Sequence, residues 1–111
     1  MDLREEKVGG VTVVLVQGRI DSTTAPALGE SLTAKLGPPK ARVLLDLSQI
    51  AYISSAGFKV LLLAAKRAEE AGSRFVLCGV SGKVRQLFDV GGFLDLFVIS
   101  GSRDEGIAAA Q

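Results

Sequence analysis

The sequence has no histidine and only one cysteine, Cys78. Histidine is the commonest general base and the commonest transition-metal ligand, and a single thiolate cannot complete a metal cluster. These absences exclude zinc enzymes and the Ser-His and Cys-His nucleophile pairs. One cysteine also cannot form an internal disulfide, which is consistent with a reducing compartment. We interpret Cys78 as a core residue of an apolar strand.

The sequence also has no excess of charge of either sign. Lys and Arg number 13 against 12 Asp and Glu, so the net charge is +1. Such a balance provides no field that would collect nucleic-acid phosphates or hold the chain on a membrane surface. Five Phe, one Tyr and no Trp also provide no ladder for stacking single-stranded bases. We therefore expect neither nucleic acid nor a membrane as a partner.

Long hydrophobic runs are absent. The longest run, residues 60–65, is far shorter than the roughly 20 residues that span a bilayer. Residues 1–6 are polar and acidic, whereas a secretory signal needs a basic start and an apolar stretch. A length of 111 residues fits one domain. We predict a single, soluble, cytoplasmic domain over residues 1–111.

Short turns divide the chain into alternating strands and helices. Gly9-Gly10 predicts a hairpin, and the apolar run over residues 11–17 predicts a buried strand. Further strands are predicted over residues 41–47, 75–78 and 96–99, with helices that begin near Ala25, Ser55, Ser81 and Ser102. This order predicts an α/β sandwich, in which a mixed, mainly parallel sheet of about five strands is covered by about four helices.

The helix predicted over Ser55–Ala71 has the clearest division into two faces. The residues expected to pack on the sheet are small or apolar: Gly57, Leu61, Ala64, Ala65 and Ala68. The opposite face carries Lys59. Phe58, Leu62 and Leu63 fall beside or on that lysine side. There they are either ordinary exposed apolar residues or a ridge on which a partner docks.

Two hydroxyl groups, those of Ser54 and Ser55, lie where this helix begins, at the carboxyl edge of the predicted sheet. One interpretation is that they only cap the helix. The other is that one of them accepts a phosphate, because the positive helix end favours an anion. The Gly-x-Ser-x-Gly motif of hydrolases is missing. Residues 79–83 are not a phosphate-binding loop, because Val84 follows the lysine where Ser or Thr is needed.

Four segments, taken in order, resemble the STAS domain of bacterial anti-sigma factor antagonists. They are residues 18–25 (GRIDSTTA), 45–48 (LDLS), 52–58 (YISSAGF) and 84–90 (VRQLFDV), and the resemblance extends over nearly the whole chain. It implies a STAS-like sandwich. It also implies a regulator that is not an enzyme and that needs no cofactor or metal of its own.

In that family the domain binds an anti-sigma factor that is also a serine kinase of the histidine-kinase-like ATPase fold. Phosphorylation breaks the complex, and a metal-dependent serine phosphatase restores it. By position, the resemblance makes Ser55 the phosphoacceptor, although Ser54 stands where many members have Asp and Ala56 where they have a second hydroxyl. The resemblance and the outward face of the helix together lead us to predict these partner-binding residues: Asp21, Ser22, Thr23, Ser54, Gly57, Phe58, Lys59 and Leu62.

Two other functions stay open on the sequence. The domain is either a STAS accessory subunit of a transport or lipid-trafficking complex, in which Ser55 only caps a helix, or a small enzyme or nucleotide binder that uses Asp21 and Ser55. Stable copurification with a membrane ATPase, without phosphoserine, would favour the first. Turnover or nucleotide binding that is lost in Ser55→Ala would favour the second. The segment 21–23 itself is interpreted either as turn chemistry or as part of the Ser55 site.

Overall fold

The computed structural model describes residues 1–111 as alternating strands and helices. The strands are β1 (Asp2–Val8), β2 (Val11–Ile20), β3 (Arg42–Ile53), β4 (Arg74–Cys78) and β5 (Val98–Ile99). The helices are α1 (Ala25–Leu36), α2 (Ser55–Ala71), α3 (Gly82–Val90) and α4 (Arg103–Ala110), with a short 3₁₀ turn, η1 (Leu94–Leu96). One five-stranded sheet has the order β1-β2-β3-β4-β5. The predicted mixed α/β sandwich is confirmed.

The sheet combines one antiparallel hairpin with parallel strands. Strands β1 and β2 are antiparallel and are joined by Gly9 and Gly10, whose φ angles of 56° and 81° suit a two-residue hairpin turn. Strands β2 to β5 pair in parallel. The carboxyl ends of β2, β3 and β4 therefore meet at one edge, from which the chain turns into α1, α2 and α3.

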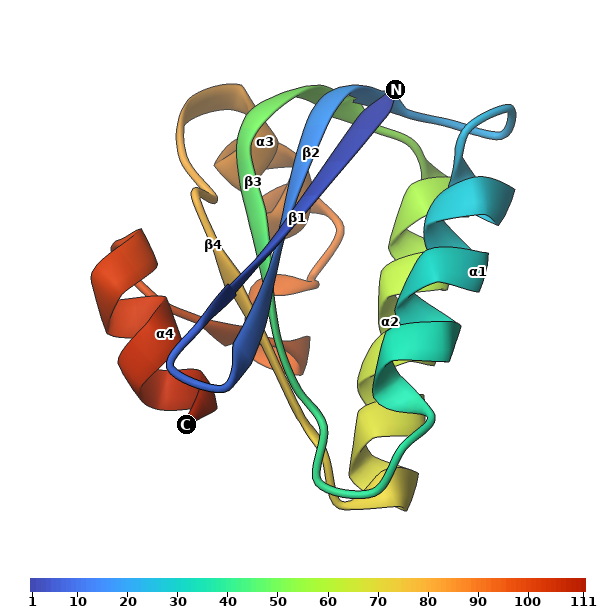
Figure 1. Ribbon diagram of the computed structural model, residues 1–111. Coiled ribbons are helices and arrows are strands. Elements are labelled where there is room, and N and C mark those ends of the chain that lie inside the picture. The colour runs from blue at the N-terminus through green and yellow to red at the C-terminus, as the bar shows by residue number, and fades with distance from the viewer.

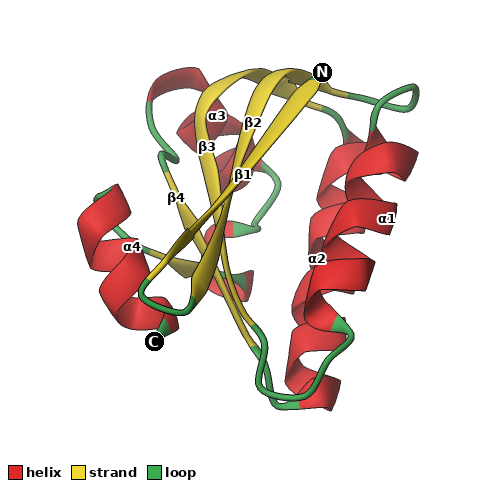
Figure 2. Cartoon of the chain, viewed as in Figure 1, coloured by secondary structure: helices red, strands yellow, loops and turns green.

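Helices cover both faces of the sheet. Helices α1 and α2 lie on one face and α4 on the other (Figure 1; Figure 2). Successive side chains of β3 point to opposite faces of the sheet, so the strand contributes to two cores. Leu45 and Leu47 point into a cluster of 21 buried residues with α1, α2 and α3. Leu44 points into a cluster of 6 buried residues with α4. No helix combines the length and the apolar character that crossing a membrane would require.

Three strands differ by more than one residue from the sequence prediction. Strand β2 continues beyond Gln17 to Ile20, where it pairs with the extended end of β3. Strand β3 continues beyond Leu47 to Ile53, because Ile50 and Ile53 are buried and hold the pairing through a polar stretch. The last strand was predicted over residues 96–99 and is only Val98–Ile99. The preceding residues form η1 instead, and the next residue, Phe97, packs edge-on against Phe88 with ring centroids 5.7 Å apart. This tertiary contact outweighs the local strand preference.

Candidate functional site

Ser54 is the cap of helix α2. Its backbone is extended (φ −85°, ψ 173°), and its Oγ accepts a hydrogen bond from the N–H of Gly57 at 3.3 Å. Its own N–H donates to the carbonyl of Ile20, the last residue of β2, at 2.8 Å. Ser54 therefore satisfies the helix end and fastens the start of α2 to the carboxyl end of β2.

Ser55 is the first residue of α2, and its side chain is exposed. Because Ser54 provides the cap, the Ser55 hydroxyl is not needed for it and makes no hydrogen bond to the protein. The first turn of α2 itself contains no acidic residue that would offset the positive end of the helix dipole. Ser55 thus presents a free hydroxyl at the positive end of the helix.

Gly57 fixes the position of this helix end. A Cβ atom at residue 57 would lie 2.7 Å from Cγ2 of Ile20 and 2.8 Å from Cγ2 of Ile53, closer than atoms of this kind approach one another. The absence of a side chain lets α2 begin directly against the ends of β2 and β3. Gly57 is buried, so its contribution to the predicted partner-binding set is this close approach and not a contact of its own.

Asp21 organises the turn between β2 and α1. Its Oδ1 accepts hydrogen bonds from the N–H groups of Thr23 at 3.0 Å and Thr24 at 3.2 Å. The hydrogen bond from Thr24, followed by that from Thr23, stabilises the ionised carboxylate. The pKa of Asp21 is therefore held below its usual value of 3.8. Asp21 is therefore ionised, and the turn interpretation is supported. Because it follows Ile20, Asp21 also lies at the same edge as Ser54, as the parallel strands predict.

An arginine and a tyrosine complete this edge. The guanidinium of Arg19 lies over the ring of Tyr52, 4.6 Å from its centroid, and its Nε is 3.9 Å from Oδ2 of Asp21. Sequence reasoning did not single out these two residues, although both fall in segments that carry the STAS resemblance. The sequence feature that could have identified them is their position at the ends of neighbouring strands. In the structure, Arg19 pairs with Tyr52 there.

Phe58 is not a surface residue, and its predicted place on the lysine side of α2 is wrong. Only 5% of Phe58 is exposed. Its ring stacks on that of Phe93, with centroids 4.3 Å apart, and meets the ring of Phe88 edge-on at 4.9 Å. A side chain as large as Phe gains more from this aromatic cluster than from exposure beside Lys59. Phe58 anchors α2 to α3 and offers a partner no free face.

The remaining predicted partner-binding residues lie at different depths. Ser22 and Thr23 are exposed in the turn before α1, and Lys59 is exposed one turn after Ser55. Leu62 is half-buried and lines a pocket of about 460 Å³. The surface that surrounds Ser55 therefore contains Lys59 and the exposed part of the Asp21 turn, with Leu62 further along α2.

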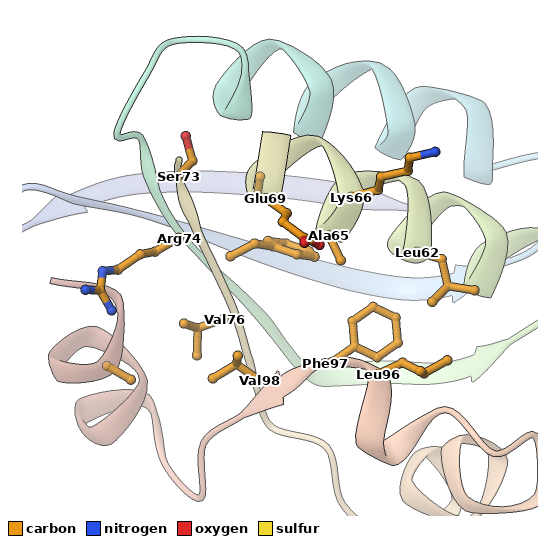
Figure 3. A pocket seen from close by; sticks show the side chains of 13 residues that line it. Leu62, Ala65, Lys66, Glu69, Ser73, Arg74, Val76, Leu96, Phe97 and Val98 are labelled. Atoms are coloured by element: carbon orange, nitrogen blue, oxygen red, sulfur yellow. The ribbon is translucent and has the colours of Figure 1, made fainter. Parts of the chain in front are cut away.

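The pocket beside Leu62 lies between α2 and the strands β4 and β5 (Figure 3). Leu62, Leu96, Phe97 and Val98 contribute to its mainly apolar lining. The charged side chain of Lys66 extends away from Phe97 at its rim (Figure 3). The pocket borders the second half of α2 and brings no reactive group to Ser55.

A buried carboxylate, that of Asp46, lies on the face of the sheet that α4 covers, opposite to α1 and α2. Asp46 is 7% exposed; its Oδ1 accepts the N–H of Ser48 at 2.9 Å, and its Oδ2 is 3.9 Å from Nε of Arg103 on α4. Burial, followed by the charge of Asp46, raises the pKa of Cys78 to about 11. Cys78 is 1% exposed, which confirms it as a core residue. This cluster fastens α4 to the sheet.

Comparison with known proteins decides the family. The sequence profile of the STAS domain matches residues 3–106. The chain belongs to the STAS domain family. A STAS relative, BtrV of Bordetella bronchiseptica, which is provisionally named an anti-sigma factor antagonist, is 38% identical over 109 residues, covering 98% of this chain and 94% of BtrV.

Solved structures show that this STAS domain shares its fold with named regulators. An anti-sigma factor antagonist from Mycobacterium paratuberculosis matches with a TM-score of 0.84 and 27% identity, over 98% of this chain and 92% of that one. The Bacillus cell fate determinant SpoIIAA, solved in its phosphorylated form, matches with a TM-score of 0.70 over 99% of this chain and 100% of its own. At 15% identity, the second likeness concerns the fold alone.

Proposed function

We propose that this STAS domain is an anti-sigma factor antagonist in a bacterial partner-switching pathway. In its unmodified form it binds an anti-sigma factor that is also a serine kinase, and phosphorylation of Ser55 ends that binding. The names of BtrV and of the Mycobacterium protein support the antagonist role. The observation that carries the proposal is the exposed Ser55 hydroxyl at the start of α2, freed from capping by Ser54.

The unusual serine at position 54 is compatible with this role. Many members of the family have Asp there, and the feature that Asp and Ser share is a side-chain oxygen that caps the helix. Ser54 supplies that oxygen to Gly57. Unlike Asp, it places no negative charge beside Ser55. A phosphate on Ser55 therefore meets no neighbouring carboxylate in the first turn of α2.

Phosphorylation acts on the interface and leaves the fold intact. A phosphoserine carries about −1.5 to −2 charges, which the exposed end of a helix stabilises by about 0.3–1 kcal/mol. The domain itself has no reason to unfold. At a protein interface, burying that charge without compensation costs several kcal/mol, and about 1.4 kcal/mol weakens binding tenfold. The phosphorylated form of SpoIIAA supports this part of the proposal, because there the same fold exists with the modification.

Catalysis in this pathway belongs to the partners. The kinase, of the histidine-kinase-like ATPase fold, brings ATP and magnesium, and a metal-dependent serine phosphatase removes the phosphate. This chain acts as the protein substrate of both enzymes and as the competitor for the anti-sigma factor. Its own role requires no cofactor, and it acts where the partners act, in the cytoplasm.

The test is the mass of the intact chain after incubation with the host's anti-sigma factor kinase and ATP. We expect one added phosphate, mapped to Ser55 and absent from Ser55→Ala. Ser54→Ala is the matched control, because it removes the neighbouring hydroxyl and should still be modified. Phosphate mapped to Ser54 would keep the mechanism and overturn the residue assignment. No phosphate, together with stable copurification with a membrane ATPase, would overturn the proposal in favour of an accessory subunit.

A further inference from the structure

The apolar pocket between α2 and the strands β4 and β5 has the size of a small-ligand site. Its volume of about 460 Å³ lies within the range of about 300–1,000 Å³ that is common for such sites, and 9 of its 13 lining residues are hydrophobic. Leu96 and Val98 line it, and they remain 55% and 59% exposed. Apolar side chains that the protein itself leaves uncovered are available to an apolar ligand. We name this cavity the β4 pocket.

A cation at one end of the β4 pocket has no partner within the protein. Arg74, the first residue of β4, is exposed and lines the pocket. Its neighbour in the sheet register is Arg42 on β3, which is also exposed. Adjacent strands are about 4.8 Å apart, so the two side chains start from neighbouring positions, where like charges repel. No carboxylate lies within 4.0 Å of either guanidinium. An anion bound at Arg74 would offset this repulsion.

The α2 side of the pocket has no such excess of positive charge. Lys66 lines the pocket, but Glu69 lines it as well, and Glu70 follows. The two acids stand three and four residues after Lys66, where opposite charges on a helix attract one another. The last turn of α2 also carries the negative end of the helix dipole. Figure 3 shows Lys66 and Arg74 extending to opposite sides of the pocket. An anionic group is therefore favoured beside Arg74.

We propose that the β4 pocket binds a small amphiphilic anion, which is an apolar chain or ring that ends in one carboxylate. The apolar part packs against Phe75, Phe97 and Val98. The carboxylate pairs with Arg74, whose N–H groups form a fork that fits the two carboxylate oxygens. This site does not involve Ser55, and it goes beyond the function proposed above.

One carboxylate fits the β4 pocket better than a chain of phosphates does. Sites for several phosphate groups typically use the N–H groups of a helix N-terminus or of a glycine-rich loop. Neither lines this pocket, to which α2 contributes only its second half. The hydroxyl of Ser73 is already engaged, because it donates to the carbonyl of Pro38 at 3.1 Å and accepts the N–H of Ala41 at 3.0 Å. Arg74 is therefore the polar group that remains free to bind one anionic head group.

The experiment titrates the chain with decanoate and with decyltrimethylammonium, a cation of the same chain length, both below their micelle concentrations. Backbone amide shifts in NMR spectra locate the site and give the affinities. We expect the wild type to bind decanoate in the β4 pocket, and to bind the cation about tenfold more weakly. Arg74→Glu should reverse this preference. Lys83→Glu is the matched control, because Lys83 is an exposed cation on α3 that forms no ion pair and does not line the pocket.

A second variant tests the apolar part of the site. Ala65 is half-buried on α2 and lines the pocket. Ala65→Leu keeps a good helix former and fills part of the cavity. It should weaken the binding of both probes by a similar factor, whereas Arg74→Glu separates them by charge. Circular dichroism of each variant controls for folding.

Three results would overturn the inference. They are no binding of decanoate to the wild type at millimolar concentration, an equal affinity for decanoate in wild type and Arg74→Glu, and amide shifts that map to the Ser55 edge in place of the β4 pocket. Each would leave the proposed function intact, because Ser55 takes no part in this site. A failure to phosphorylate Ser55 would likewise leave the β4 pocket intact.

Discussion

Replacing Gly57 by alanine tests how helix α2, and with it Ser55, is held at the sheet edge. The new Cβ would lie 2.7 Å from Cγ2 of Ile20 and 2.8 Å from Cγ2 of Ile53. Both neighbours are β-branched, so their side chains have little rotational freedom with which to move away. We expect α2 to be pushed outward or the two isoleucines to leave their preferred rotamers.

Two opposing effects set the magnitude. Inserting a methyl group into a well-packed core typically costs about 1–3 kcal/mol. Removing a glycine from a helix returns about 1 kcal/mol. Because the new Cβ meets two stiff side chains closer than 3 Å, the packing cost should lie in the upper part of that range, about 2–3 kcal/mol. The net loss in the free energy of unfolding should then be about 1–2 kcal/mol, which corresponds to a fall in melting temperature of about 4 °C or more for a domain of this size.

Gly29 provides the matched control for this substitution. It lies in α1, and a Cβ at that position would be 3.4 Å and 3.5 Å from the two Cγ atoms of Val60, an ordinary contact distance. Gly29→Ala should therefore gain about 0.5–1 kcal/mol from the helix backbone alone. Urea denaturation of both variants measures the difference. If Gly57→Ala is as stable as Gly29→Ala, the close approach of α2 to β2 and β3 does not hold.

Three further predictions concern ionisable groups. Because hydrogen bonds lower the pKa of Asp21, the stability it adds is present at neutral pH and is lost as the pH falls below 3.8, so the difference between wild type and Asp21→Ala in urea titrations should shrink at acid pH. Cys78, with its pKa raised to about 11, should react with a disulfide thiol reagent at pH 8 only in unfolded protein. Arg103→Met removes the cation near buried Asp46 and should cost about 1–2 kcal/mol in urea denaturation, whereas Arg42→Met stays within about 0.5 kcal/mol.

Local patterns were sufficient for the order and type of the elements. The switch from alternating to helical spacing located α1 and α2, and the glycine pair located the β1–β2 hairpin. The extents of β3 and β5 were not accessible in this way. They depend on tertiary contacts, those of Ile50 and Ile53 in one case and that of Phe97 with Phe88 in the other.

The candidate site was also only partly predictable. Parallel strands that end at one edge bring Asp21 and Ser54 together, and this followed from the sequence. The sequence did not show which of Ser54 and Ser55 caps the helix and which has a free hydroxyl. Both residues are acceptable caps, and only the backbone geometry decides between them. Phe58 was misplaced because a helical projection shows its direction on α2 but not the aromatic rings of Phe88 and Phe93 that meet it.

The account depends most on the effect of one phosphate on Ser55. Titration calorimetry of the kinase with unmodified chain, and with chain phosphorylated only at Ser55, measures that effect directly, and circular dichroism of both forms controls for folding. We predict unchanged spectra and an affinity about 100-fold lower for the phosphorylated form, since an uncompensated charge at an interface costs several kcal/mol. Equal affinities of the two forms would contradict the account.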